Sequence, residues 1–328
     1  MHLMYLGITL LWLTGVVGAV PPLEKRAGRT SPPSGCKVVR QGSNSNGEFP
    51  TLGAAVSSLS GGGSACIFVY GGTYKENFTI SYGGPLTIYG YTTDTGSYKD
   101  NTVKISRSMT SHVSGSLDTS STINAKSANL KMYNINIENT YGKGAQAVSL
   151  VAQGQHQGYY GCGFYGYQDT LYAKSGAQYY SKCYIEGADD FIFGDAAAWF
   201  NQCTISCNGP GSITATSRDK ADDPAWYVFD HCMVDAKSGV SGLASQVYLG
   251  RPWRVLSRVI YQYSYLGDII NPTGWTTMAQ GATPIYMEYN NNGPGSSTAK
   301  REWVTKTDKP ITMSELWQGS YDWIDTSY

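Results

Sequence analysis

The sequence predicts an all-β protein folded as a parallel β-helix, a solenoid in which short strands form stacked coils. One pattern recurs four times: an aromatic residue, a cysteine three positions later and an apolar residue two positions after that. The copies are Tyr159-x-x-Cys162-x-Phe164, Tyr180-x-x-Cys183-x-Ile185, Phe200-x-x-Cys203-x-Ile205 and Phe229-x-x-Cys232-x-Val234. The cysteines are spaced 21, 20 and 29 residues apart, with no amphipathic helix between them. Such a unit cannot bury its apolar face alone, so successive coils are expected to stack ~4.8 Å apart.

Segments outside the repeat fit the same architecture. Strands are predicted at Ala65–Tyr70, Leu86–Tyr91 and Leu130–Glu138. The longest interval of the repeat indicates an inserted loop at Gly209–Ala225. A short helix is predicted within Phe49–Leu59, where it would cap the N-terminal end of the solenoid, because an open coil edge invites aggregation. Residues 27–328 are therefore expected to form a single β-helix domain.

Composition and motif searches exclude several classes of protein. Hydrophobic residues make up 41% of the 328 residues and charged residues 15%, which is typical of a globular protein. Lys plus Arg equals Asp plus Glu at 24 each, so no basic excess indicates a nucleic-acid partner. The sequence contains no G-x-S-x-G, which disfavours a serine esterase, and no C-x-x-C, which leaves a zinc site without support.

The N-terminus predicts secretion. Residues 1–19 are interpreted as a signal peptide, because the apolar run Tyr5–Val17 is too short to span a bilayer and small residues follow it. Residues 20–26 are interpreted as a propeptide that ends at the dibasic pair Lys25-Arg26. The mature protein is expected to begin near Ala27, to be extracellular and to have no membrane segment once the signal is removed.

The seven cysteines and one sequon fit a secreted protein. An odd number of cysteines leaves at least one thiol free or bonded to another chain. The cysteines of the repeat are predicted to be mainly buried core residues. Cys183 and Cys203 are the favoured disulfide, because one coil of separation can bring their Cα atoms within the required ~4.4–6.8 Å. Asn77-Phe78-Thr79 is an N-glycosylation sequon.

Two aspartates occupy equivalent positions in the repeat. Asp169 lies seven residues after Cys162, and Asp190 lies seven residues after Cys183. They should stack on adjacent coils, roughly 5 Å apart at the backbone. Close carboxyl groups do not both ionise easily, so one becomes a neutral acid beside an ionised base or nucleophile. Spacing alone leaves a second interpretation open, a pair of solvated turn aspartates.

Five short motifs carry a resemblance to a known family. They are Gly72-Thr-Tyr-Lys-Glu76, Gln146-Ala-Val-Ser-Leu150, Gly166-Tyr-Gln-Asp-Thr-Leu171, Asp190-Phe-Ile-Phe-Gly194 and Leu249-Gly-Arg-Pro-Trp253. In this order they resemble the motifs of the pectin methylesterases, and the likeness runs through most of the mature chain. The departures, Ser149, Val151 and the pair Ala188-Asp189, remove no polar group that the chemistry needs.

The resemblance implies a right-handed parallel β-helix with its site in a long cleft, and it implies catalytic roles. Asp190 would be the nucleophile and Asp169 the general acid and then base. Gln146 and Gln168 would donate amide N–H groups to the oxyanion. Arg251 would hold Asp190 ionised through a bidentate pair.

The resemblance also implies the substrate, methyl-esterified homogalacturonan, and an enzyme that works as a monomer without cofactor or metal. Trp253 and Phe193 would offer flat surfaces to sugar rings, and Thr122 is a further candidate contact. Two alternatives remain at this point: a β-helix glycosidase or lyase that cleaves the same polymer, or a non-catalytic wall-polysaccharide-binding solenoid. Glutamines beside the acids favour ester hydrolysis, and no cluster of carboxylates suggests the calcium site expected of a lyase.

Overall fold

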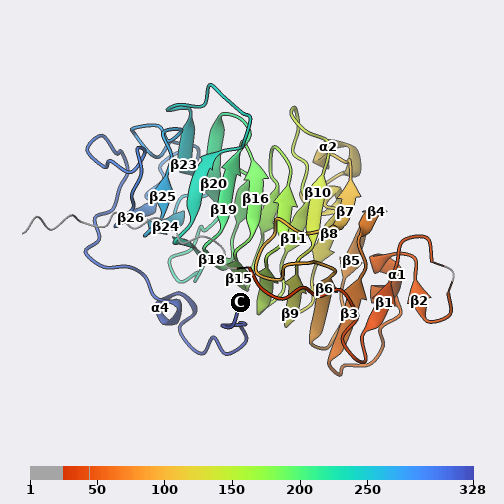
Figure 1. Ribbon diagram of the computed structural model, residues 1–328. Helices are drawn as coiled ribbons and strands as arrows, with labels where there is room; N and C mark the ends of the chain where they lie inside the picture. The colour runs from red at the N-terminus through yellow and green to blue at the C-terminus, as the bar shows by residue number, and fades with distance from the viewer. Residues whose placement is uncertain (1–24, 44) are drawn as a thin grey trace, which may run out of the picture.

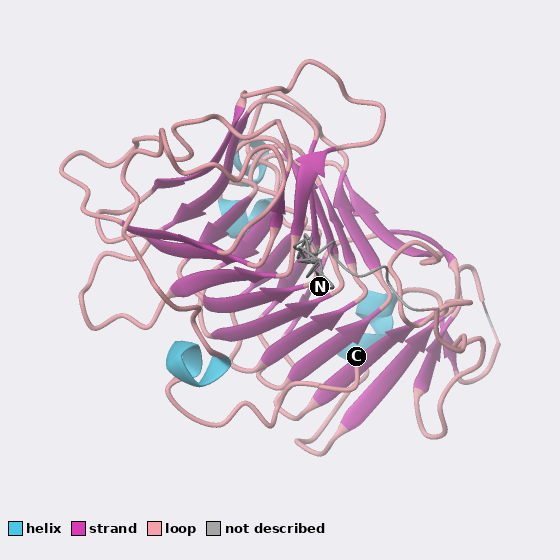
Figure 2. Ribbon diagram, turned by 60° about the vertical axis from the view of Figure 1, so that its left-hand side comes forward, coloured by secondary structure: helices cyan, strands magenta, loops and turns pink. Residues whose placement is uncertain are grey.

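The chain folds into three parallel sheets whose strands stack coil upon coil along one axis (Figures 1 and 2). The computed structural model describes residues 25–43 and 45–328. Paired strands all run parallel, and each coil in the middle of the solenoid contributes one strand to each sheet. The parallel β-helix predicted from the repeat is confirmed.

Neighbouring strands within each sheet come from successive coils, so their spatial order follows the axis of the solenoid. The first sheet contains, in that order, β2 (Glu48–Phe49), β1 (Lys37–Val39), β3 (Ala65–Val69), β6 (Leu86–Gly90), β9 (Leu130–Tyr133), β12 (Gln157–Tyr160), β15 (Ala177–Ser181), β18 (Ala197–Asn201), β21 (Trp226–Asp230), β24 (Arg258–Gln262) and β26 (Ile285–Tyr289). The second sheet contains β25 (Tyr265–Leu266), β22 (Met233–Ala236), β19 (Thr204–Cys207), β16 (Tyr184–Gly187), β13 (Gly163–Tyr165), β10 (Asn136–Asn139), β7 (Val103–Arg107) and β4 (Gly72–Lys75). The third sheet contains β23 (Val247–Pro252), β20 (Gly211–Thr216), β17 (Ile192–Gly194), β14 (Leu171–Ala173), β11 (Leu150–Ala152), β8 (Ile123–Ala125) and β5 (Phe78–Ile80).

The aromatic residues of the repeat form a ladder inside the first sheet. The rings belong to Tyr159, Tyr180, Phe200, Phe229 and Tyr261, and their successive centroids are 5.0, 4.7, 4.5 and 4.4 Å apart. All five side chains are fully buried. Stacked aromatic pairs contribute roughly 0.5–1.5 kcal/mol beyond the area they bury, so the ladder also fixes the register between coils.

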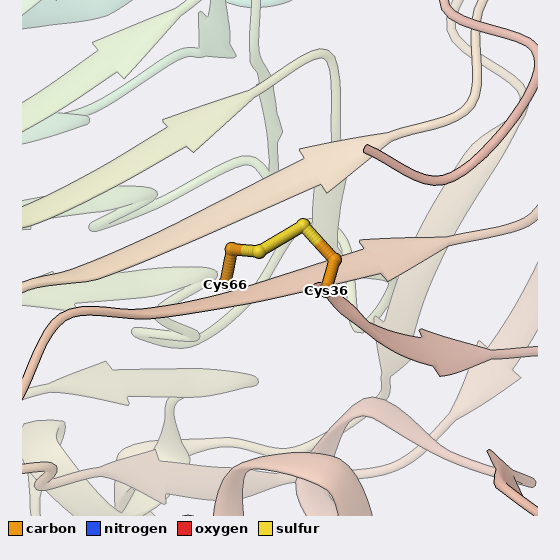
Figure 3. Close-up of a disulfide and its surroundings, with 2 residues drawn as sticks. All are labelled: Cys36 and Cys66. Carbon is orange, nitrogen blue, oxygen red and sulfur yellow. A yellow bond between two sulfur atoms is a disulfide. The ribbon is translucent and has the colours of Figure 1, made fainter. Parts of the chain in front are cut away.

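The disulfide predicted between Cys183 and Cys203 is wrong, because both are free, buried thiols. The Sγ–H of Cys183 donates to the carbonyl oxygen of Tyr159 at 3.4 Å, and Cys203 donates likewise to Tyr180 at 3.5 Å. These thiols therefore bond to the backbone of the preceding coil rather than to each other. The disulfide joins Cys36, just before β1, to Cys66 in β3, with 4.6 Å between the Cα atoms (Figure 3).

The N-terminal cap is the helix α1 (Leu52–Ser57), which confirms the predicted helix over a shorter span. The hydroxyl of Thr51 caps its first turn by accepting the N–H of Ala54 at 3.2 Å. Glu76 accepts the N–H groups of Leu52 and Gly53, each at 2.9 Å. A carboxylate at a helix N-terminus satisfies unpaired donors and complements the helix dipole. Glu76, the last residue of the first motif, thus serves the fold rather than the chemistry.

Two segments differ from the structure predicted for them. The segment predicted as one strand, Leu130–Glu138, is divided into β9 and β10, because Asn134 has φ 53° and turns the chain between them. The inserted loop is shorter than Gly209–Ala225, because β20 occupies the first part of that range. Its remainder, 217–225, is held by the buried guanidinium of Arg218, which donates to the carbonyl oxygens of Ala221, Asp223 and Leu256.

The C-terminal segment crosses the outer face of the first sheet (Figure 1) and includes α4 (Met313–Trp317). Tyr133 donates its hydroxyl to Asp325 at 2.9 Å, and the indole N–H of Trp317 donates to the carbonyl oxygen of Ala197 at 3.0 Å. The signal peptide, 1–19, and most of the predicted propeptide lie outside the described residues. Within the described part of the chain, no helix has the length and apolar character needed to cross a membrane.

Candidate active site

Asp169 and Asp190 lie one above the other on neighbouring coils. The register of β14 with β17 pairs Leu171 with Ile192, so the aspartates two residues upstream are also equivalent. The N–H of Asp169 donates to the carbonyl oxygen of Asp189 at 3.1 Å, which ties the two turns together. Both aspartates adopt the left-handed backbone conformation, with φ 62° for Asp169 and 49° for Asp190. Asp tolerates this conformation in tight turns. The stacking predicted from the cysteine spacing is confirmed.

Two glycines make this turn possible in both coils. A Cβ added to Gly166 would lie 2.5 Å from the hydroxyl oxygen of Thr170, and one added to Gly187 would lie 2.2 Å from Cβ of Phe191. Thr170 and Phe191 are the residues that directly follow the two aspartates. Glycine therefore leaves room for the chain to fold back, which explains why both copies of the repeat carry it at the same place.

Arg251, on β23, binds Asp190 through two parallel hydrogen bonds. Its Nε lies 2.8 Å from one carboxylate oxygen of Asp190, and its Nη2 lies 2.7 Å from the other. The same Nη2 lies 3.2 Å from both carboxylate oxygens of Asp189. Sequence reasoning missed this contact of Asp189. A bidentate guanidinium fixes the carboxylate in position and favours its ionised form.

The surroundings of the two aspartates give their carboxyl groups different pKa values. Burial, and then the charges of Asp190 and Asp189, raise the pKa of Asp169 well above its usual value. Burial also raises the pKa of Asp190, but the hydrogen bonds and charge of Arg251 oppose that rise. The side chains are almost fully enclosed, with Asp169 3% and Asp190 8% exposed. Asp169 is thus the better proton donor and Asp190 the more readily ionised group.

Of the two glutamines, Gln146 lines the cavity together with the two aspartates. Its Oε1 accepts a hydrogen bond from the hydroxyl of Ser111 at 3.2 Å, and its side chain lies close enough to Asp169 to oppose part of the rise in the pKa of that carboxyl group. Gln168 is half-buried, and its carbonyl oxygen accepts the N–H of Ala147 at 3.1 Å. The side chain of Gln168 is not among the described groups that line the cavity beside the aspartates.

That cavity has a volume of about 70 Å³. It is lined by Leu117, Gln146, Asp169, Asp190, Phe193, Ala215, Trp253 and Met278. The volume exceeds the ~10–15 Å³ that a single water molecule needs, so a small group such as an ester can enter. Apolar side chains form most of its wall, which lowers the local polarity around the two carboxyl groups.

Aromatic rings form one side of the cavity. Phe193 is 2% exposed and stacks on Tyr172 with 4.3 Å between centroids. Trp253 is half-buried, and its ring lies 6.0 Å from Phe193. Trp253 therefore offers a surface to a ligand, whereas Phe193 mainly supports the cavity from below.

Two lining residues missed by sequence reasoning lie outside the three sheets. Leu117 begins α3 (Leu117–Ser120), which follows the one-turn helix α2 (Ser111–Ser114), and Met278 is 47% exposed. Neither residue belongs to a motif or a periodic pattern, so no sequence signal identified it.

Thr122, the further candidate for a substrate contact, lies directly before β8 in the third sheet. It is fully buried, and its hydroxyl donates to the carbonyl oxygen of Glu138 at 2.8 Å. The hydroxyl therefore stabilises the turn between the second and third sheets. Thr170 occupies the equivalent position two coils later, and its hydroxyl donates to the carbonyl oxygen of Glu186 at 2.9 Å.

These features define the class of protein: a parallel β-helix with a buried carboxyl pair, an arginine and aromatic rings at a small surface cavity. Over residues 25–43 and 45–328, no group of three His, Cys, Asp or Glu side chains is placed to hold a metal ion.

Comparison with known proteins identifies the family. The pectinesterase family profile matches residues 38–315. A probable pectinesterase A of Neosartorya fischeri is 54% identical over 330 residues, covering 100% of both chains, and pectinesterase A of Emericella nidulans is 56% identical over 97% of this chain and 98% of its own. The solved pectin methylesterase of Aspergillus niger superposes with a TM-score of 0.88 at 56% identity, covering 92% of this chain and 100% of that one. The carrot pectin methylesterase gives 0.76 at 28% identity, covering 84% and 90%.

The chain belongs to the pectinesterase family. Its reaction is the de-esterification of pectin, a carboxylic ester hydrolysis, and its fold is the right-handed parallel β-helix expected from the sequence. Family membership decides against the two alternatives left open by the sequence, cleavage of the polymer backbone and a solenoid without activity.

Proposed function

We propose that this protein hydrolyses the methyl esters of homogalacturonan through an acyl-enzyme on Asp190. One observation carries the proposal. Arg251 pairs with Asp190, while the pKa of Asp169 on the neighbouring coil is raised further than the pKa of Asp190. One ionised and one neutral carboxyl group at a single ester-sized cavity are what a two-step ester hydrolysis requires.

In the first step, a carboxylate oxygen of Asp190 attacks the carbonyl carbon of the methyl ester. The charge that develops on the carbonyl oxygen is stabilised by the amide N–H of Gln146, held at the cavity by Ser111. When the bond to the methoxy oxygen breaks, Asp169 gives its proton to that oxygen and methanol leaves. The products of this step are a mixed anhydride on Asp190 and an ionised Asp169.

In the second step, Asp169 takes a proton from a water molecule, and the resulting hydroxide attacks the anhydride. Hydrolysis releases the galacturonate carboxylate and restores both aspartates. We assign Gln168 to positioning, because its carbonyl oxygen holds the N–H of Ala147 next to Gln146. Trp253 would contact the sugar ring, and Phe193 would support it.

The acyl-enzyme has a direct test. If hydroxylamine is present during turnover, its attack on the anhydride at the enzyme's carbonyl leaves a hydroxamate on Asp190. We expect peptide mass spectrometry to find that modification only in enzyme that received methylated pectin. Enzyme incubated with fully de-esterified pectate is the control. Rapid methanol release with neither a modified Asp190 nor an enzyme-dependent hydroxamate on the polymer, at any hydroxylamine concentration, would contradict the covalent intermediate and favour direct attack by water.

We also propose that the protein is secreted and matured by cleavage after Lys25-Arg26. The relatives are fungal pectinesterases, and a dibasic pair follows the predicted signal peptide.

Maturation can be read from the secreted protein itself. N-terminal sequencing of protein from the culture medium is expected to begin at or close to Ala27. Secreted protein that still begins at Met1 would contradict both the signal peptide and the propeptide.

A further inference from the structure

A groove of about 490 Å³ lies at the opposite end of the third-sheet strands from the catalytic aspartates. Asp169 and Asp190 stand two residues before β14 and β17, whereas Ser175 and Asp195, which line the groove, stand just after the same two strands. Within the described part of the chain, the groove and the catalytic cavity share no lining residue. The groove is therefore separate from the place where the ester is hydrolysed.

The floor of the groove runs along the axis of the solenoid. It is formed by turns that follow β11, β14, β17 and β20, at residues 155–156, 175–176, 195 and 223–224. These turns belong to four successive coils, and neighbouring coils lie ~4.8 Å apart, so the floor spans roughly 14 Å. Its length suits a short chain of several units rather than a single small molecule.

Two tryptophans of the C-terminal segment form the opposite wall. Trp317 ends α4, which lies beside β18 (Figure 1), and its indole N–H donates to the carbonyl oxygen of Ala197 at 3.0 Å. The ring of Trp323 stacks on His156 of the floor, with 5.3 Å between centroids, and lies 5.0 Å from the ring of Trp317. Both indoles are half-buried, so they are held in place and keep surface for a ligand. Fixed aromatic rings of this kind pack against the apolar faces of sugars.

The polar groups of the groove favour an uncharged ligand. Ser175 on the floor and Gln318 and Ser320 on the wall are exposed, and their side chains can form hydrogen bonds with hydroxyl groups. Asp195 and Asp223 are the acids of the groove, and none of the described lining residues is Lys or Arg. An anionic galacturonate chain would therefore be repelled.

The state of the acid pair also fits a neutral ligand. Burial, and then the charge of Asp223, raise the pKa of Asp195 to about 7. In mildly acidic solution the carboxyl group of Asp195 is therefore largely neutral, and it can donate as well as accept a hydrogen bond, as a sugar hydroxyl does. The nearby Arg218 and Arg258 donate to the backbone carbonyl oxygen of Asp223. With one of its two carboxyl groups neutral, the groove attracts a cation only weakly.

We propose that this groove binds a neutral oligosaccharide, a chain of uncharged hexose or pentose units, independently of the catalytic site. A glycan bound there leaves the catalytic cavity open, because the strands of the third sheet separate the two. The groove would hold the enzyme on material in which a neutral glycan accompanies the esterified polymer. This inference goes beyond the proposed function and does not depend on the covalent mechanism.

The test is calorimetric titration at about pH 5 with four neutral trisaccharides: cellotriose, xylotriose, arabinotriose and β-1,4-galactotriose. At least one is expected to bind with a Kd in the millimolar range or lower. Trp323→Ala is expected to weaken that binding about fivefold to tenfold, because it removes a stacking surface. Trigalacturonate is the anionic probe of equal length, and its affinity should be the same in Trp323→Ala as in wild type.

A second variant, Ser175→Tyr, fills the groove from an exposed position and removes no buried contact. It should weaken binding of the neutral trisaccharide at least as much as Trp323→Ala. Both variants should release methanol from methylated pectin within about twofold of the wild-type rate. Thermal unfolding establishes that each variant is folded, and if Trp323→Ala is not, Ser175→Tyr decides the result.

The matched control is Trp303→Ala, which removes an indole that is 43% exposed in the C-terminal segment but does not line the groove. No binding of any neutral trisaccharide, binding that survives the groove substitutions, or an equal loss from Trp303→Ala would overturn the inference. Tighter binding of putrescine than of every neutral probe would overturn it too, since the groove would then be a cation site. Asp190→Asn should bind the neutral trisaccharide like wild type, so a failure of the catalytic mechanism would leave this result unchanged.

Discussion

Asp190→Asn is expected to lower kcat for methanol release by on the order of 10⁴-fold or more, with the fold retained. The amide keeps the shape of the side chain but lacks the negative oxygen that attacks the ester. Arg251 would still donate one hydrogen bond to the amide oxygen, although its second donor would face an NH₂ group. Methanol should be assayed at saturating pectin, and circular dichroism should establish that the variant is folded.

Asp189→Asn is the matched control for this substitution. It removes the same charge, also within 3.2 Å of Arg251, but from a side chain that does not line the catalytic cavity. We expect its effect on kcat to stay below about tenfold, through the pKa of Asp169 and the position of Arg251. If folded Asp190→Asn released methanol at a rate near that of wild type, the nucleophilic role of Asp190 would be wrong.

The sequence predicted the fold and the carboxyl pair because both depend on a strict repeat. In a solenoid, residues at the same position of successive coils lie next to each other in space. The alignment of Cys162 with Cys183 therefore also aligns the residues that follow each cysteine. The same spacing placed Gly166 and Gly187, whose missing side chains the turn requires. Local periodicity was therefore enough to find Asp169 and Asp190 on adjacent coils.

Features that depend on side-chain direction could not be predicted in the same way. Spacing brought Cys183 and Cys203 together, but their thiols point to backbone carbonyl oxygens and form no bridge. Thr122 occupies a turn of the third sheet, yet its hydroxyl is buried. Adjacent positions in one turn can face opposite ways, and the sequence does not reveal which side reaches solvent.

Cavity residues outside the repeated strands could not be identified from the sequence either. Leu117 and Met278 line the cavity, but their segments have no periodic pattern. Neither residue belongs to a motif, so there was no reason in the sequence to select them. Asp189 was noticed only as a departure from the family pattern, and its contact with Arg251 follows from the position of β23 two coils further along the third sheet. Such contacts between distant segments arise from the packing of whole coils.

Asp169→Asn is expected to lower kcat/KM by about 10²–10⁴-fold, the range in which general acid–base catalysis contributes. Asparagine cannot protonate the departing methoxide or take a proton from water. The double variant with Asp190→Asn should be little worse than either single variant, because the pair acts as a unit. Methanol release under kcat/KM conditions checks both statements, and a fully additive double variant would contradict the shared role.

The pH profile gives the sharper test of Asp169. In wild type, kcat/KM should rise with pH as Asp190 ionises and fall at higher pH as Asp169 loses its proton. Burial and the neighbouring carboxylates raise the pKa of Asp169 well above its usual value, so the neutral acid persists to a higher pH than an exposed aspartate would allow. The residual activity of Asp169→Asn should therefore keep the acidic limb and lose the alkaline one. If the alkaline limb remained in that variant, the proton donor would be another group, and the assignment of Asp169 as the acid would be wrong.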